Sequence, residues 1–546
     1  MKRLKQIFLA LTKNERVVFI VASCATVASF VVVMGIVIAQ ATTVVPAAGG
    51  EYTEGMVGQP EYVNPVTASG EADESLVKLI YSNLADLADS VNVTPDGRTW
   101  TVHLKDGLTW QDGQKLTSDD VIFTIQSIED PDANSPLAAS WQGVAVNRVS
   151  ELELQFTLAE PYVFFADNLS NLYILPKHLF ADTPPGNWHL SDYNLKPIGS
   201  GPYEFVSYDK RSDGVISDYH LQAWSGYAGT KPLIQNFDFS YFANNDELIK
   251  SFDAGTVDGM GGLMASDMPS ITRPYTVSSW RVPSYYAVFF NESKSIPLQD
   301  PAVRAALSEA VDRNALVSDV LGGYGAPDYG PIPQDAPYFV PTMTTSSLDD
   351  ASATLTDAGW ILATSTRVKI VQKTPVPLVV NLTVPDIDFL TKTAADLQTD
   401  WQALGATVNV TTEPPADIVS EAIKNRDYES LLFGNVLGPS SNLYAFWDSS
   451  QRFSPGLNLA IYSNKSVDNL VEAAEQDLSD ASRTAQFAAA EQDIVNDVPA
   501  IFLYSPDYLT VTGKNLQGVA PGFIPDASDQ FRQVAAWYLN TARVLK

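Results

Sequence analysis

The sequence is poor in the side chains that build disulfide scaffolds and metal centres. Its 546 residues include one cysteine, Cys24, and four histidines. One thiol cannot form a disulfide or a structural zinc cage within a chain. No pair among His103, His178, His189 and His220 has the H-x-x-x-H spacing of a catalytic zinc helix. An intrachain disulfide framework is therefore excluded, and we expect neither a metal nor another cofactor.

Basic residues are also scarce. The chain has 34 lysines and arginines against 64 aspartates and glutamates, a net charge of −30, which argues against nucleic acid as a partner. The first forty residues hold five bases and one acid, a net of +4, which leaves −34 for the rest. A hydrophobic content of 45% with 10% aromatics is typical of globular proteins, and the length suits two or three domains.

One long hydrophobic run is present near the N-terminus. Val17 to Ala39 contains 23 residues without a charge, enough to cross a bilayer at about 1.5 Å per residue. Bases precede this run and an acidic chain follows it, which by the positive-inside rule places the rest outside the cytoplasm. We expect a basic cytoplasmic stub over 1–16, a transmembrane anchor or signal over 17–39, and a linker rich in small residues over 40–50.

Two other interpretations of this start remain open. Ala39-Gln40-Ala41 has the small-x-small pattern of a signal cleavage site, and Val21-Ala22-Ser23-Cys24 loosely resembles a lipidation box. All three interpretations export the remainder of the chain. If Cys24 lies in the membrane, the exported part has no thiol, which suits an oxidising compartment.

Strand-like and helix-like stretches alternate through the exported part, which predicts an α/β chain. Asp300 is expected to cap a helix that starts at Pro301, and Gly405 is expected to separate a helix from a strand. The patterns predict strands over 98–104, 108–110, 151–158, 281–291, 407–410 and 501–504, and helices over 117–127, 300–311, 393–404 and 467–496.

Several motifs, in order along the chain, resemble one family. They are LKDGLTWQDG with LTSDDV (104–121), LPKH (175–178), PIGSGPY (197–203), FDAGTVD (252–258), DPAVRAALSEAVDR (300–313), the 321–333 and 358–360 segments, and the 499–504 segment. Together they resemble the oligopeptide, dipeptide and nickel class of ABC-transporter solute-binding proteins, over most of residues 51–546. A co-linear series is far more specific than any single motif.

The resemblance implies a two-lobed, hinged, periplasmic-binding-protein-like α/β fold that encloses a ligand between its lobes. Mapped onto this sequence, lobe I is expected over 51–70, 190–283 and 505–546, an inserted third subdomain over 71–189, and lobe II over 284–504. Closure around a ligand is then a population shift driven by contacts that the ligand makes with both lobes.

One departure from the family concerns the ligand. In peptide-binding members an aspartate of lobe II holds the α-ammonium of the peptide, and Asn435 stands at the corresponding position. An amide still accepts a hydrogen bond, but the charge-assisted part is lost. Asn435 is nevertheless the first candidate ligand residue. The other candidates are aromatic residues expected near the cleft and acids at the start of a lobe I helix: Tyr444, Phe446, Trp447, Tyr324, Glu71, Asp73 and Glu74.

The resemblance implies a monomeric, extracytoplasmic, membrane-anchored binding protein that delivers a peptide or another small solute to an ABC permease, without enzymatic chemistry. Two alternatives stay open. An exported carbohydrate-active enzyme would need two carboxylates about 5–9.5 Å apart across a cleft, which the sequence cannot show. A sensor or adhesion module would keep the hinge but lack a permease.

Overall fold

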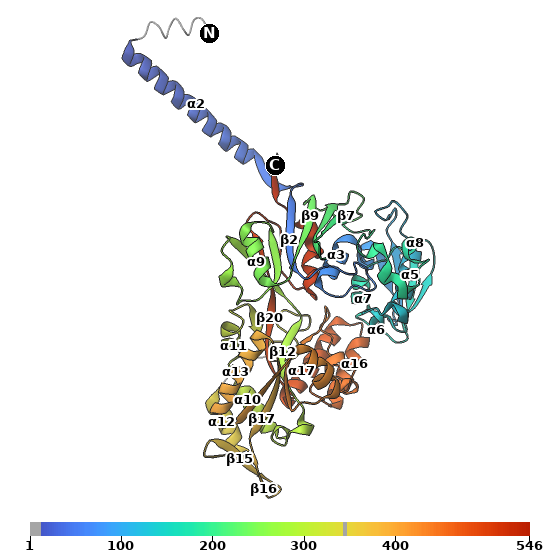
Figure 1. Cartoon of the computed structure of the whole chain (residues 1–546), viewed down its shortest axis with the longest axis vertical. Coiled ribbons are helices and arrows are strands. Elements are labelled where there is room, and N and C mark those ends of the chain that lie inside the picture. Colours follow the sequence, from blue (N-terminus) through green and yellow to red (C-terminus); the bar gives the residue numbers. More distant parts are fainter. Residues whose placement is uncertain (1–11, 342–346, 546) are drawn as a thin grey trace.

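A computed structural model of the chain describes residues 12–341 and 347–545. Two lobes are stacked along the long axis, and the 71–189 segment forms a further body beside lobe I (Figure 1). The expected two-lobed α/β fold is confirmed. A single helix projects away from lobe I, and the described C-terminal end lies at its base.

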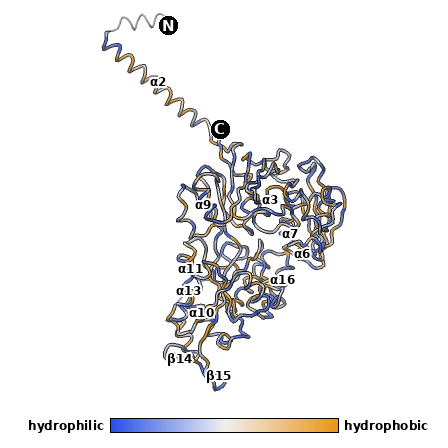
Figure 2. The backbone as a smooth tube through the Cα atoms, in the orientation of Figure 1, coloured by the Kyte–Doolittle hydropathy of each residue, from blue (hydrophilic) through white to orange (hydrophobic). Residues whose placement is uncertain are grey.

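The projecting helix is α2 (Lys13–Ala41), which contains the uncharged run. Its candidate membrane-crossing span is Lys13–Val37, and no part of the most apolar window is buried. Figure 2 shows it as a mostly hydrophobic tube that starts with a hydrophilic turn. Among the described residues it is the one helix long and apolar enough to cross a membrane, and a signal sequence has the same properties.

The segment after this helix is a strand rather than the expected linker. β1 (Thr42–Ala47) pairs antiparallel with β21 (Asn540–Leu545), the last described strand of the chain. The two ends of the exported part are therefore joined by backbone hydrogen bonds. Local composition could not indicate this pairing, because its partner lies about 500 residues away in sequence.

One sheet of twelve strands runs through both lobes. Its order is β18-β17-β19-β12-β20-β10-β2-β9-β8-β7, and β11 and β13 also pair with β20. The strands are β2 (Glu51–Val57), β7 (Tyr203–Lys210), β8 (Ile216–Ala223), β9 (Asn236–Phe242), β10 (Gly259–Leu263), β11 (Tyr275–Arg281), β12 (Ser284–Phe290), β13 (Gly325–Pro327), β17 (Val379–Pro385), β18 (Thr407–Glu413), β19 (Ser430–Val436) and β20 (Ala500–Gly513).

The chain crosses between the lobes twice, side by side. β20 pairs with β12 through its first half and with β10 and β11 through its second half. The second crossing joins Arg281 at the end of β11 to Ser284 at the start of β12. Each crossing contains a proline, Pro283 or Pro506, which fixes one backbone dihedral where the lobes meet. Two adjacent connections of this kind define a hinge.

Lobe II has helices on both faces of its strands (Figure 1). All of β12 except Tyr286 is buried, as expected for a strand covered on both sides. One face carries α10 (Pro301–Glu309), α12 (Leu348–Asp357) and α13 (Asp388–Ala403), and the other carries α15 (Tyr444–Trp447), α16 (Lys465–Gln476) and α17 (Asp480–Asp497). Each set of helices builds its own hydrophobic core with the sheet.

The 71–189 body contains a separate four-stranded antiparallel sheet, ordered β3-β4-β6-β5, and it shares a core with lobe I. Its elements are α3 (Glu71–Ile80), α4 (Leu84–Leu87), β3 (Ala88–Val93), β4 (Thr99–Leu104), α5 (Ser118–Glu129), α6 (Ala138–Trp141), β5 (Ala145–Arg148), β6 (Glu153–Thr157), α7 (Phe165–Asn171) and α8 (Lys177–Phe180). Lobe I holds the helix α9 (Asn245–Ala254). Lobe II also holds α11 (Arg313–Asp319), α14 (Pro415–Asp417), β14 (Ile361–Ala363), β15 (Thr366–Val371) and β16 (Thr374–Pro377).

Most of the predicted elements are present. Asp300 caps α10 by accepting from the backbone N–H of Ala302, and Gly405 ends α13 with φ +86°. Two expectations were wrong in detail. Residues 108–110 form only an isolated bridge, Thr109 to Lys115, and the helical region at 467–496 is broken into α16 and α17.

Candidate functional site

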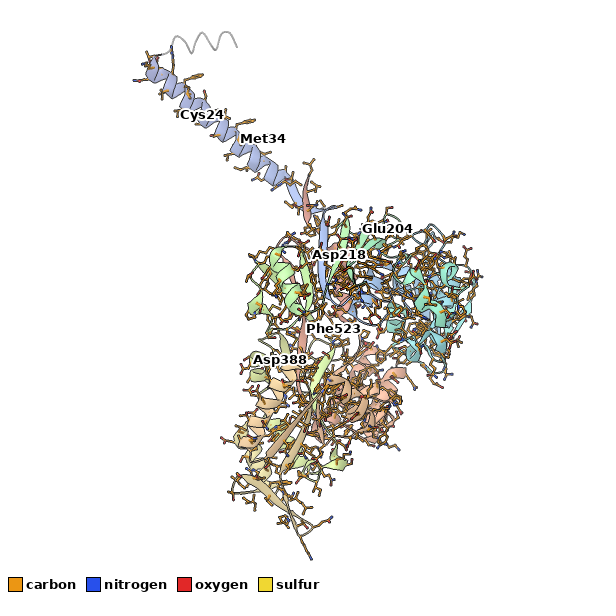
Figure 3. All side chains as sticks on the ribbon, in the orientation of Figure 1. Cys24, Met34, Glu204, Asp218, Asp388 and Phe523 are labelled. Carbon is orange, nitrogen blue, oxygen red and sulfur yellow. The ribbon has the colours of Figure 1, made fainter. Side chains whose placement is uncertain are left out.

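A pocket lies between the lobes, beside the hinge. Lobe I lines it with residues 263–266 and Leu509, and lobe II lines it with residues 320–324 and 387–392. The lining is mostly apolar, but Asp388 and Lys392 form an ion pair of 2.8 Å at its lobe II side. Figure 3 shows Asp388 at the level where the lobes meet. Tyr324, a candidate ligand residue, lines this pocket.

Arg281, at the end of β11, forms ion pairs with both the adjacent crossing and lobe II. Its guanidinium binds Asp507 on the adjacent crossing (Nη1 to Oδ1, 2.6 Å) and reaches Asp335 of lobe II (Nε to Oδ2, 3.6 Å). Phe523 of lobe I bridges to Arg281 through the backbone and packs against the lobe II core that contains α15 to α17. The lobes therefore touch through both charged and apolar groups (Figure 3).

Asn435 lies at the carboxyl end of β19, on the sheet face covered by α15. Its side-chain amide donates to the Tyr285 hydroxyl (2.9 Å), and the indole N–H of Trp447 donates to the same oxygen (3.2 Å). The structure thus brings two candidate residues, Asn435 and Trp447, to the hydroxyl of Tyr285. Tyr285 was not among the residues predicted from the sequence. Burial raises the pKa of Tyr285, so its hydroxyl stays neutral.

This polar junction is almost closed to solvent. Tyr285 and Trp447 are fully buried, and Asn435 is 5% exposed. Among the described residues, the amide oxygen of Asn435 accepts no hydrogen bond, so it is available to a donor. Of the two neighbouring candidates, Phe446 is buried in the same core, and Tyr444 is half-buried with its hydroxyl 3.3 Å from Ser450 Oγ.

Two buried carboxyl groups lie behind this junction in lobe II. Asp328 is 2% exposed, and among the described residues no side chain donates a hydrogen bond to its carboxyl group, although the Gln334 backbone N–H lies close to it. Burial raises the pKa of Asp328 well above its usual range. Glu491 on α17 is 3% exposed, and burial raises its pKa to about 8. A side chain at Gly330 would collide with this Glu491 carboxyl, which explains the glycine there.

The three acidic candidates of lobe I sit at the start of α3 in different surroundings. Asp73 is buried and accepts from the backbone N–H groups of Glu61 (2.8 Å) and Tyr62 (3.0 Å), so it holds a turn. Glu71 accepts from the Tyr508 hydroxyl on β20, and burial raises the pKa of Glu71.

Glu74 belongs to a cluster of acids and one base. Burial and the neighbouring Asp526 carboxylate raise the pKa of Glu74. Lys78 bridges Asp526 (3.4 Å) and Asp529 (2.7 Å) on the segment that follows β20. The candidates Glu71 and Glu74 therefore lie beside β20 and the segment that follows it, and as ligand residues they stay predictions.

The 71–189 body also contacts lobe II directly. The Val163 N–H donates to the Glu475 carbonyl of α16 (2.8 Å), and Ser440 hydrogen-bonds Asp167. Phe164 is 6% exposed and stacks on Phe487 of α17 with ring centroids 6.2 Å apart. Contacts on this side and at the hinge therefore join the two lobes.

The arrangement provides features that can enclose a solute. Within the described residues no group of three or more histidines, cysteines, aspartates or glutamates could hold a metal ion. What the geometry provides is a hinge, a mostly apolar pocket and a polar junction at strand ends. These features define a two-lobed binding protein that closes by hinge motion.

Comparison with known proteins places the chain within that class. Residues 84–454 match the family model of bacterial extracellular solute-binding proteins, family 5 (middle region). The chain belongs to this family, as the motif series predicted, and the family is extracytoplasmic.

Individual relatives are distant but cover most of the chain. It is similar to the oligopeptide-binding protein AppA of Bacillus subtilis (25% identity, 87% of this chain and 89% of AppA). It is also similar to the dipeptide-binding protein of Escherichia coli (24% identity, 84% and 90%). Among solved structures, the ABC transporter substrate-binding protein CtaP of Listeria monocytogenes has a TM-score of 0.77 at 23% identity (90% and 99%), and AppA of Bacillus subtilis with a nonapeptide has 0.68 at 23% (91% and 100%).

Proposed function

We propose that this protein captures a peptide or peptide-like solute between lobe I and lobe II and delivers it to an ABC permease. The α2 helix holds it at the outer face of the cell membrane as a monomer. The protein carries out no covalent chemistry of its own.

The observation that carries this proposal is the position of the polar junction. Asn435 and Tyr285 stand on neighbouring strands at the lobe II edge that faces the hinge, and Asn435 keeps a free amide oxygen among the described residues. An amide oxygen accepts from a peptide N–H or an ammonium group. The mostly apolar pocket beside the hinge, with Tyr324, suits side chains of mixed polarity.

The names of the relatives agree with this chemistry. The AppA and E. coli relatives are an oligopeptide-binding and a dipeptide-binding protein, and the AppA structure contains a nonapeptide. The candidate ligand residues Asn435, Trp447, Tyr444, Phe446, Tyr324, Glu71, Asp73 and Glu74 remain proposals, and Asn435 is first among them.

The first experiment is mass spectrometry of any ligand that denaturation releases from the purified full-length protein. Peptide libraries are then titrated while tryptophan fluorescence and thermal unfolding are recorded. We expect a peptide to raise the melting temperature and change the fluorescence as the lobes close. No shift with peptides, metal chelates or sugars would contradict the proposal.

The permease is tested separately. Co-purification of the full-length protein from detergent-solubilised membranes is expected to recover a permease in the presence of ligand. Ligand binding without a permease in repeated purifications would instead support a sensor on the same fold.

A further inference from the structure

The membrane-proximal end of the exported body is a two-stranded ribbon, β1 with β21. No residue separates α2, which ends at Ala41, from β1, which starts at Thr42. The ribbon pairs six residues of each strand, from Thr42 opposite Leu545 to Ala47 opposite Asn540. Figure 1 shows the described C-terminal end at the base of α2.

One face of this ribbon combines exposed apolar groups with a base. Residues paired across an antiparallel ribbon point to the same face, and positions two apart share it. Val44, which is 53% exposed, lies opposite Arg543, and Leu545, 81% exposed, lies opposite Thr42. The Arg543 guanidinium donates to the Thr42 hydroxyl across that face (3.2 Å). We call this face, with Pro46 and Thr541, the ribbon face.

The charge around the ribbon is opposite to that of the rest of the exported body. Residues 40–50 contain no charged side chain, and residues 533–545 contain Arg543 as their one charged side chain. The whole chain carries −30. An acid-free segment with apolar and basic side chains has the composition of a protein surface that lies on anionic lipid headgroups.

A tightly packed turn connects the ribbon to lobe I. Gly49 and Gly50 connect β1 to β2 with φ of +117° and +96°, which only glycine adopts easily. A side chain at either position would press on Asn540 or Leu539, so the turn is packed against the start of β21. The Gly49 N–H also donates to the Leu233 carbonyl (2.8 Å).

We propose that the ribbon face lies on the surface of the bilayer and keeps lobe I in contact with it. This rests on the proposed membrane anchoring by α2. Because the ribbon begins one residue after the helix, it lies within a few ångströms of the point where the chain leaves the membrane. Lobe II is attached only through the hinge and the 71–189 body, so it moves relative to a lobe I that stays on the lipid.

The test is a depth measurement on the full-length protein. Leu545→Cys is made in a Cys24→Ser background, labelled with an environment-sensitive dye, and reconstituted into vesicles of phosphatidylcholine and phosphatidylglycerol. Ile370→Cys in the same background is the matched control, since Ile370 is 65% exposed on β15 at the far end of lobe II. Flotation of both variants reports the anchor independently of the dye.

We expect the dye at residue 545 to emit at shorter wavelength, to be quenched by nitroxide lipids, and to have a several-fold smaller iodide quenching constant than the dye at residue 370. Arg543→Glu with Val44→Glu should abolish this difference while flotation persists.

Equal iodide access at both positions in floating protein would overturn the ribbon proposal and leave the anchor intact. Protein that fails to float would overturn both proposals. Protection at residue 545 that appears only with a co-reconstituted permease would overturn the assignment to lipid.

Discussion

Glu491 is a buried acid whose folded pKa is about 8. In the unfolded state the pKa of a glutamate is about 4.3. Between these values the folded state holds a proton that the unfolded state has lost, so the free energy of unfolding falls as pH rises from about 4 to about 8 and then levels off. Asp328 close by acts in the same direction, since its pKa is also raised.

Glu491→Gln removes the titrating proton and keeps the shape of the side chain. We therefore expect the variant to gain stability over the wild type as pH rises, on the order of 1–3 kcal/mol by pH 8, with a small difference at pH 5. Urea unfolding at both pH values measures this. Gln492→Ala, at an exposed position of the same helix α17, is the control and should change stability equally at both pH values because it removes no titrating group.

Asn435→Asp tests whether the amide oxygen of Asn435 contacts the ligand. If the Asn435 oxygen faces an ammonium group, the variant should bind free-amine peptides more tightly by about 1 kcal/mol or more, because the hydrogen bond becomes charge-assisted. N-acetylated peptides should show no such gain. Without ligand the variant should melt at lower temperature, since a carboxylate would be 95% buried without a counter-charge. Unchanged affinity for both peptide forms would remove Asn435 from the site.

Local signals account for the parts of the fold that the sequence predicted. The capping box of Thr117 and Asp120 and the Asp300 cap mark helix starts through contacts within three residues. The junction at Tyr285 could not be predicted in this way. Its partners Asn435 and Trp447 are 150 and 162 residues away. The pairing of β12 with β19 places Asn435 opposite Tyr285, and the packing of α15 in the same core brings Trp447 to the same oxygen.

At the scale of elements, the 71–189 body and lobe II share a hydrophobic contact. Phe164 packs into the lobe II core, where it stacks on Phe487, and Tyr162 of its own body lies beside it. Motif order predicted neither this contact nor the β1–β21 ribbon, because both join segments with no shared local pattern.

Phe164→Ala should shift the protein toward the open arrangement. Truncating a buried phenylalanine costs about 3–5 kcal/mol in a core, so losing a third of this from the closed state alone weakens ligand binding about 5- to 17-fold. Calorimetric titration with a bound peptide measures the affinity, and small-angle scattering measures the opening. Phe453→Ala is the control, since Phe453 is 64% exposed on lobe II. An unchanged affinity and radius of gyration would show that this contact does not stabilise the closed form.

At the scale of the whole molecule, charge is unevenly distributed. The first forty residues carry a net charge of +4 and the rest of the chain carries −34. Because the only cysteine is Cys24 within α2, the two lobes contain no thiol of their own. Pairs of cysteines can therefore be introduced across the lobes without competing partners.

Val163→Cys with Glu475→Cys, in a Cys24→Ser background, should lock the lobes together. The backbone hydrogen bond of 2.8 Å between these residues places their backbones side by side, and a disulfide forms where the Cα atoms are less than about 7 Å apart. If the ligand is enclosed by hinge closure, oxidation before ligand is added should block binding, and oxidation afterwards should slow release many-fold. Reduction should restore both rates, and each single-cysteine variant should behave like wild type. Fast exchange of ligand in the oxidised double variant would mean that this closed arrangement does not enclose the binding site.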